Sequence, residues 1–357
     1  MRHTVVAAAA IGAALNLSLP ASADPDIAAA NAAMQAVVRK AHAPGAAFAV
    51  ASRGRLIDVK GFGFADVAAR TPVGPDTMFA LASCSKPITA MAIMKLVDDG
   101  KLTLGTRAFP LLEIKSAADP RLARITIEEL LNHASGLPHD VNASTNDPMN
   151  TARAAANVRL KFTPGSDQAY SNAGFNVLGA VIEKVSGRRY IDFVRDVVFT
   201  PAGVTRFAAL DAGAPIPGQA VRYDKRGRVV TNRIAEGGTP AGGWVLSAAD
   251  MVRVLVAYDA GKIVSPASRA AMLAPPVAPL KLRADGTAFG LGWDVVYHAG
   301  GDPNAVFFGK NGGITGSSTW VEHRPDGTNF AAFYNGGSGI GAHRPGLTAV
   351  EAALGGP

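Results

Sequence analysis

The sequence contains a single cysteine, Cys84, among 357 residues. One thiol cannot form an intramolecular disulfide, so packing must hold the fold together even in an oxidising compartment. Charge is not concentrated either: the formal net charge of +7 is spread along the chain, without a basic run or an alternation of basic and aromatic residues. We therefore expect no nucleic-acid partner.

Two common catalytic motifs are also missing. The sequence has no H-E-x-x-H, which would indicate a zinc protease, and no G-x-S-x-G, which would indicate the nucleophile elbow of an α/β-hydrolase. His133 and the pair His139-Asp140 have neither metal-ligand spacing nor a third ligand. We expect His133 to order a loop, and we expect neither a metal nor a cofactor.

Long hydrophobic runs are confined to the N-terminus. Met1-Arg2-His3 gives a positive start, residues 4–19 are almost uncharged and apolar, and Ala21-Ser22-Ala23 fits a cleavage site. This pattern predicts a cleaved signal peptide over residues 1–23 and a mature chain over 24–357. No later stretch is long enough to span a bilayer, so we expect a periplasmic or secreted protein without a membrane span.

The apolar fraction, 48%, is sufficient for one large domain. Hydrophobic spacing predicts strands and helices in a definite order along the chain. The expected helices are 27–41, 88–97, 127–132, 175–185, 190–199, 248–258 (opened by a capping box at Ser247-Asp250) and 347–354; the expected strands are 46–51, 56–59, 313–318, 317–323 and 328–334. This order indicates an α+β fold, in which an antiparallel sheet from both chain ends is flanked by helices and carries an all-helical insert at about 105–235.

Ser83-Cys84-Ser85-Lys86 precedes the expected buried helix and carries the first candidate chemistry. A residue three positions along a helix lies on the same face, so Lys86 should point its amine toward the Ser83 hydroxyl. Pro87 fits only the first turn of a helix, which supports this placement. A buried lysine loses its proton readily and can help to deprotonate a serine.

Further elements follow in a matching order. They are Tyr170-Ser171-Asn172 and Lys310-Asn311-Gly312, with the flanking signatures 130–137 (LLNHASGL), 162–165 (FTPG), 242–244 (GGW) and 289–293 (FGLGW). Over nearly the whole mature chain, this set resembles the serine β-lactamase and penicillin-binding-protein superfamily, in particular class C β-lactamases and the related D-alanyl-D-alanine carboxypeptidases and family VIII esterases. The resemblance implies the transpeptidase-like fold and makes Ser83, Lys86 and Tyr170 catalytic.

The resemblance also makes Asn172, Lys310, Gly312 and Gly313 substrate-binding residues. Asn172 can orient Lys86 and a substrate amide. Lys310 can hold a substrate carboxylate, and a tyrosine between two ammonium groups should have a stabilised phenolate, which makes Tyr170 a candidate general base. By resemblance, the N–H groups of Ser83 and Gly313 form an oxyanion hole.

Several residues could compete for these roles. Ser85 lies on another helix face, and Lys225-Arg226-Gly227 lies in a polar turn without a glycine-rich strand after it. We interpret Cys84 as a small core residue, and Trp244, Trp293 and Trp320 each as core rather than substrate-binding.

The prediction is a serine hydrolase that cleaves an amide or ester through a Ser83 acyl-enzyme, on a small-molecule or peptidoglycan-like substrate. The lysine at position 310 favours a β-lactam or a D-alanyl peptide, whereas Asn311 stands where threonine is usual in the family. Two alternatives remain open: a carboxylesterase of the same fold, and a penicillin-sensing or cell-wall-binding module without turnover.

Overall fold

The computed structural model describes residues 25–115, 118–141, 147–210, 215–231, 238–297, 307–336 and 344–355. The predicted signal peptide, residues 1–23, lies outside these ranges. Within the described ranges no helix is both long enough and apolar enough to cross a membrane. The helices are α1 (Ile27–Ala41), α2 (Lys86–Asp98), α3 (Ala108–Leu111), α4 (Ile127–Leu131), α5 (Pro148–Ala155), α6 (Asn172–Ser186), α7 (Tyr190–Val194), α8 (Thr239–Gly242), α9 (Ala248–Asp259), α10 (Pro266–Met272) and α11 (Arg344–Ala353).

The strands form a large antiparallel sheet and a small one. The large sheet has the order β3-β2-β1-β11-β10-β9-β8-β7, and the small sheet has the order β4-β6-β5. The strands are β1 (Gly45–Ser52), β2 (Arg55–Asp66), β3 (Thr71–Pro72), β4 (Met78–Ala80), β5 (Ala208–Ala209), β6 (Trp244–Ser247), β7 (Thr287–Phe289), β8 (Asp294–Val296), β9 (Phe307–Ile314), β10 (Ser317–His323) and β11 (Asn329–Tyr334).

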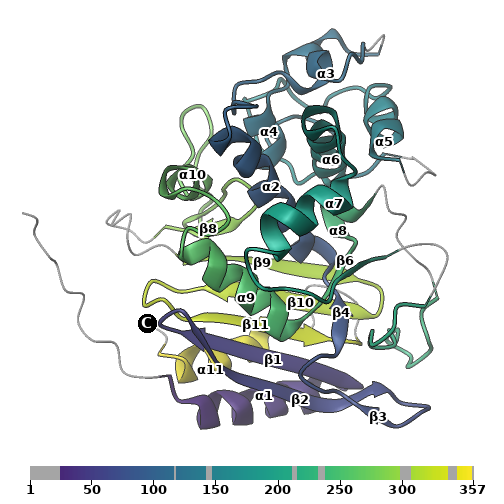
Figure 1. The fold of residues 1–357 in the computed structure, drawn as a ribbon, viewed down its shortest axis with the longest axis vertical. Helices are drawn as coiled ribbons and strands as arrows, with labels where there is room; N and C mark the ends of the chain where they lie inside the picture. Colours follow the sequence, from purple (N-terminus) through teal and green to yellow (C-terminus); the bar gives the residue numbers. More distant parts are fainter. Residues whose placement is uncertain are drawn as a thin grey trace, which may run out of the picture.

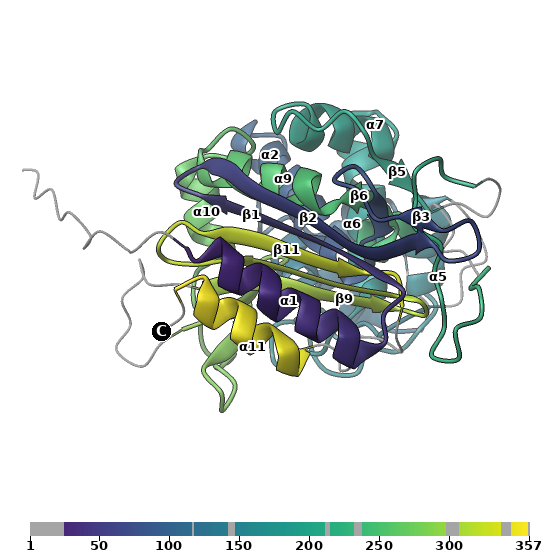
Figure 2. The same ribbon diagram turned by 90° about the horizontal axis from the view of Figure 1, so that it is seen from below.

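The two ends of the chain meet in the middle of the large sheet. Strand β1 pairs with β11, with Ala46 opposite Tyr334 and Ala51 opposite Asn329. Helices α1 and α11 lie together on one face of this sheet, as Figure 2 shows. The other face carries α9, and the remaining helices extend from there to the far end of the molecule (Figure 1). Because helices cover both faces, nearly every residue of β1 is buried.

These observations confirm the α+β fold with an antiparallel sheet from both chain ends. The regular elements in the described part of 105–235 are helices except for β5, which pairs with β6, so the insert is not all-helical as expected. Two local expectations were wrong. Residues 313–318 are not a strand, because β9 ends at Ile314 and the chain turns at Gly316, whose φ of 77° suits glycine. Ser247 does cap α9 by accepting from the Asp250 N–H, but its own hydroxyl donates to the Asp250 carboxylate, which differs from a reciprocal capping box.

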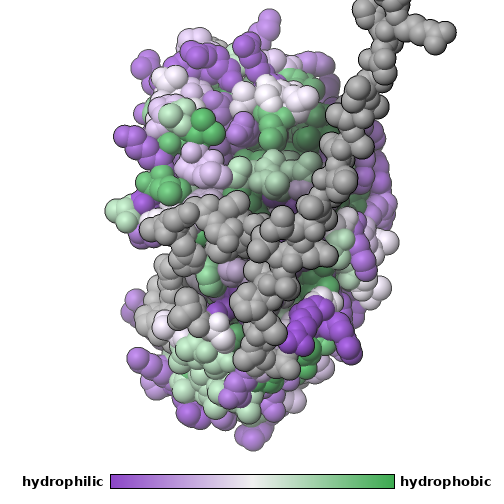
Figure 3. All heavy atoms as spheres, turned by 90° about the vertical axis from the view of Figure 1, so that its left-hand side faces the viewer, coloured by the Kyte–Doolittle hydropathy of each residue, from purple (hydrophilic) through white to green (hydrophobic). Residues whose placement is uncertain are grey.

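The surface in Figure 3 is the side of the molecule that lies to the left in Figure 1. Hydrophilic residues surround the outline of this view, and hydrophobic residues form smaller groups between them. Deeper in the molecule, the main hydrophobic core extends from the sheet through α2, α6 and α9. The core therefore joins the sheet to the helical part and supports the segment that carries Ser83.

Candidate active site

Ser83 lies in a 3₁₀ turn, Ala82–Ser85, directly before α2. Ala82 has a φ of 48°, in the left-handed region that costs a non-glycine residue energy and is tolerated where the surroundings enforce it. In a 3₁₀ turn residues three apart are eclipsed, which brings Lys86 Nζ to 3.3 Å from Ser83 Oγ. The helix begins three residues later than a start at Ser83 would give, yet the predicted serine–lysine contact is present.

Lys86 is fully buried and holds its amine with two further contacts. Its Nζ lies 2.7 Å from Asn172 Oδ1 and 2.6 Å from the carbonyl oxygen of Ala241 in α8. The Asn172 amide is itself oriented, because its Nδ2 donates to Asp140 Oδ1 at 2.9 Å. Burial, followed by the positive charge of Lys310, lowers the pKa of Lys86 well below its usual value.

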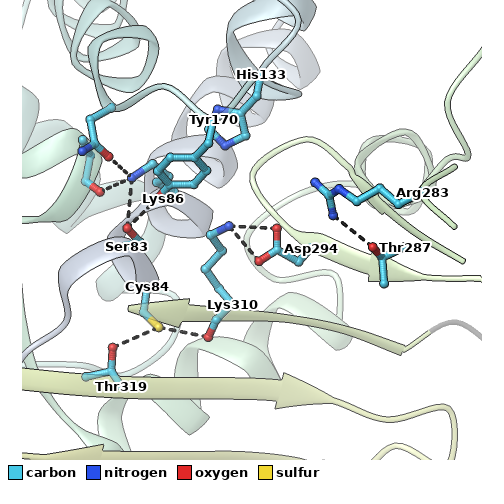
Figure 4. Close-up of polar contacts among 12 residues, drawn as sticks. Ser83, Cys84, Lys86, His133, Tyr170, Arg283, Thr287, Asp294, Lys310 and Thr319 are labelled. Atoms are coloured by element: carbon cyan, nitrogen blue, oxygen red, sulfur yellow. Dashed lines mark hydrogen bonds and ion pairs between the residues drawn. The ribbon is translucent and has the colours of Figure 1, made fainter. Parts of the chain in front are cut away.

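Tyr170 contacts the same hydroxyl, with its Oη 2.5 Å from Ser83 Oγ (Figure 4). Both lysines lie near the Tyr170 ring, with Lys86 Nζ 4.7 Å and Lys310 Nζ 5.1 Å from its centroid. Burial raises the pKa of Tyr170 and outweighs the hydrogen bond to Ser83, which lowers it. The expectation of a stabilised phenolate was therefore wrong, because burial removes water from the phenol and the carboxylates of Asp294 and Asp140 also raise its pKa.

His133 orders the segment that carries Tyr170, as expected. Its carbonyl oxygen accepts from the Ala169 N–H, and its ring Nδ1 accepts from the Ser171 N–H at 3.2 Å. Burial and the nearby lysine charges lower the pKa of His133, which keeps this ring nitrogen free to accept. The described residues contain no cluster of histidine, cysteine and carboxylate side chains suited to a metal.

Lys310 enters the site from β9 and has a partner that the sequence analysis missed. Its Nζ lies 2.8 and 2.9 Å from the two carboxylate oxygens of Asp294 in β8. Asp294 directly follows the 289–293 signature, and Ala241 directly precedes the 242–244 signature, so both were adjacent to recognised motifs. Their roles could not be predicted, because spacing along the chain does not show which side chain or carbonyl meets which lysine.

Gly312 lets β9 pass close to the turn that carries Ser83. A Cβ at this position would lie 2.2 Å from the Leu81 carbonyl oxygen and 3.0 Å from the Ser83 nitrogen. Gly313 is the next residue along β9, opposite Ser318 of β10. The structure thus brings the Ser83, Lys86, Tyr170, Asn172 and Lys310 side chains together, with the Gly312–Gly313 backbone beside them.

The competing residues lie elsewhere or are occupied. The Ser85 hydroxyl is buried and accepts from the Trp244 N–H. Lys225 is exposed in a turn closed by a hydrogen bond from Gly227 to Asp224. Cys84 is buried, and burial raises the pKa of its thiol to about 12. Trp244 and Trp293 lie in the core, as expected, whereas the half-buried Trp320 lines a cavity of about 710 Å³ beside Tyr170 and Lys310.

Comparisons with known proteins agree with this geometry. The Beta-lactamase family model matches residues 30–349, and the chain belongs to this family. Penicillin-binding protein 4 of Amycolatopsis lactamdurans is 31% identical over 326 residues, which are 83% of this chain and 82% of that protein.

Solved structures share the fold. A crystal structure of SurE with D-Leu has a TM-score of 0.74 and 26% identity over 92% of this chain and 74% of that one. The octameric penicillin-binding protein homologue from Pyrococcus abyssi has a TM-score of 0.75 and 25% identity over 92% of this chain and 76% of that one. The chain is accordingly a serine hydrolase of the β-lactamase fold.

Proposed function

We propose that the protein cleaves an amide or ester bond next to a D-alanyl-like residue, or a β-lactam, through an acyl-enzyme on Ser83. The observation that carries the proposal is the arrangement around Lys86 Nζ. A neutral amine has two hydrogens and one lone pair. Two of its three neighbours, Asn172 Oδ1 and the Ala241 carbonyl, can only accept, so the lone pair is left for Ser83 Oγ.

Lys86 is therefore assigned as the general base for acylation. It takes the proton of the Ser83 hydroxyl while Oγ attacks the substrate carbonyl carbon. Its lowered pKa supports this role, because the base must be neutral before it can accept the proton. The N–H groups of Ser83 and Gly313 are assigned to the oxyanion that forms on the carbonyl oxygen.

Tyr170 is assigned as the proton donor to the leaving group. Its raised pKa keeps the phenol protonated at neutral pH, and its oxygen is already in contact with Ser83 Oγ. As the bond to the leaving nitrogen or oxygen breaks, the phenol gives up its proton and takes the one held by Lys86. Water then attacks the acyl-enzyme and Lys86 accepts the proton of that water. Lys86 passes this proton to Ser83 Oγ as the acyl bond breaks, which restores the Ser83 hydroxyl and the neutral amine.

The substrate class follows from the relatives and from the chain itself. One relative is named penicillin-binding protein 4, and the SurE structure contains D-Leu. The predicted signal peptide would place this chain in the periplasm or outside the cell, where peptidoglycan-like substrates occur. The second candidate is a carboxylesterase of the same fold. The Lys310–Asp294 ion pair favours it, because Asp294 already occupies the lysine that would hold a substrate carboxylate.

Labelling with a fluorescent penicillin and with a fluorophosphonate tests the proposal. We expect fluorophosphonate label on the wild type, none on Ser83→Ala, and a large loss on Lys86→Ala. Ser85→Ala and Lys225→Ala are matched controls, because each removes the competing serine or lysine. Label that persists on Ser83→Ala would refute the assignment of the nucleophile.

Mass spectrometry over time separates an enzyme from a sensor. A Ser83 adduct that disappears and regenerates free protein indicates turnover, whereas a permanent β-lactam adduct indicates the sensing module. Turnover of a chromogenic cephalosporin against a p-nitrophenyl ester then ranks the two hydrolase candidates. Fluorophosphonate label without penicillin label would favour the esterase.

A further inference from the structure

The cavity lined by Tyr170 and Lys310 also presents the Asp294 carboxylate, and the Lys310 ammonium lies behind this carboxylate. The Lys310 side chain is only 2% exposed, whereas that of Asp294 is 32% exposed. Both oxygens of Asp294 contact Lys310 Nζ, and the rings of Tyr170 and Phe289 lie 5.1 and 5.7 Å from the same nitrogen. An anionic substrate group would therefore meet a carboxylate where the sequence predicted a cation.

We propose that Asp294 determines specificity by excluding substrates with a carboxylate on the leaving group, so that the enzyme prefers uncharged esters and amides. This inference rests on the proposed function and narrows its substrate class. Penicillins and D-alanyl-D-alanine peptides carry a carboxylate on the leaving group and should react slowly, whereas D-alanyl esters and amides without that charge are favoured. A substrate carboxylate at Lys310 would have to share the ammonium with the Asp294 carboxylate or displace that carboxylate. Two carboxylates in contact with one ammonium lie close together and repel each other. An uncharged ester or amide carries no such penalty.

The backbone fixes Asp294 at this place. Asp294 pairs with Gly309 across β8 and β9 and with Phe289 across β7 and β8, so strands hold its backbone on both sides. Lys310 is held too, because its carbonyl oxygen accepts a hydrogen bond from the Cys84 thiol at 3.1 Å. Arg283 also lines the cavity, with its guanidinium carbon 3.9 Å from the centroid of the Phe289 ring, and Figure 4 shows it on the far side of Asp294 from Ser83.

A matched pair of thioesters tests the inference. N-benzoyl-D-alanyl thioglycolate and its methyl ester share the same scissile bond and differ in one carboxylate on the leaving group. Released thiol is measured with a chromogenic disulfide, and kcat/KM is compared as the ratio of the acid to the methyl ester. We expect wild type to favour the methyl ester, and Asp294→Asn to raise the ratio about tenfold, as expected for one charge contact.

Asp285→Asn is the matched control, since Asp285 lines the same cavity but hydrogen-bonds to Thr287 instead of Lys310. It should change the ratio less than about threefold, as expected for an exposed charge that is not in contact. A wild type that prefers the acid, or an Asp294→Asn ratio that does not rise, overturns the inference. If Asp294→Asn does not fold, the wild-type ratio still decides.

Fluorophosphonate labelling distinguishes this failure from failure of the proposed function. Label on Ser83 together with an unchanged ratio refutes only the role of Asp294. Absence of label together with no thioester turnover refutes the proposed function, and the inference with it.

Discussion

Replacing Gly312 with alanine should disable the site while leaving the fold largely intact. The new Cβ would lie 2.2 Å from the Leu81 carbonyl oxygen, 2.3 Å from Thr319 Oγ1 and 3.0 Å from the Ser83 nitrogen. An ordinary contact needs at least 3.4 Å, so β9 or the 3₁₀ turn must move by about 1 Å. Overpacking of this kind costs about 1–3 kcal/mol of unfolding free energy.

The effect on catalysis should be larger than the effect on stability. A displacement of about 1 Å at a catalytic group can cost about 10²-fold in rate. We expect Gly312→Ala to lower the rate of fluorophosphonate labelling of Ser83 by about that factor, while thermal unfolding remains cooperative. Gly105→Ala is the matched control, because a Cβ there would meet no atom within 4 Å.

A double variant tests the cause. Gly312→Ala combined with Thr319→Ala removes the hydroxyl from the overlap but leaves the Leu81 carbonyl oxygen in place. The rate should therefore not recover. Retention of the rate by Gly312→Ala within about threefold of wild type would refute the reasoning, because β9 would then tolerate a side chain against the nucleophile turn.

The remaining predictions concern protonation, the thiol and a buried carboxylate. Because the pKa of Lys86 is lowered and the neutral amine is the base, the labelling rate should rise with pH through that pKa, as a stopped-time labelling series would show. Cys84 should resist iodoacetamide at pH 8 in the native state and react only in denaturant, since burial raises its pKa to about 12. Asp119 accepts from Arg121 and from the Leu160 N–H, so Asp119→Asn should lower the urea-unfolding free energy at pH 7 by about 1–3 kcal/mol. Because these partners lower the pKa of Asp119, this difference should shrink as pH falls below about 4, and a difference that stays constant would contradict the assignment.

The contact between Ser83 and Lys86 was predictable from their spacing, whereas the resemblance to a known family predicted that Tyr170 and Lys310 join them. Ser83 and Lys86 are three residues apart, and a helical turn of either kind brings their side chains together. The pairing of β1 with β11 was also predictable, since short apolar segments at both ends of the chain need one shared core.

Other features depended on contacts between distant segments. Asp294 and Lys310 meet only because β8 pairs with β9, which sequence spacing does not reveal. The raised pKa of Tyr170 arises from burial beside His133 and Phe289, whereas the sequence suggested only that two charges were near. The predicted strand over 313–318 failed because small residues suit both a strand and a tight turn, and Gly316 takes the turn.

The two lysines of the site have opposite surroundings, and the charge of Lys310 affects the protonation of Lys86. Among the described residues Lys86 hydrogen-bonds to uncharged groups, and the carboxylates of Asp140 and Asp294 only partly offset the lowering of its pKa by burial. Lys310 has a carboxylate in direct contact, and its positive charge is the second cause, after burial, of the lowered pKa of Lys86. Asp294 has two opposite influences on Lys86. It positions the Lys310 ammonium, which lowers the pKa of Lys86, and its own negative charge raises that pKa. The same carboxylate that would exclude an anionic substrate therefore also helps to set the pH at which Ser83 can be deprotonated.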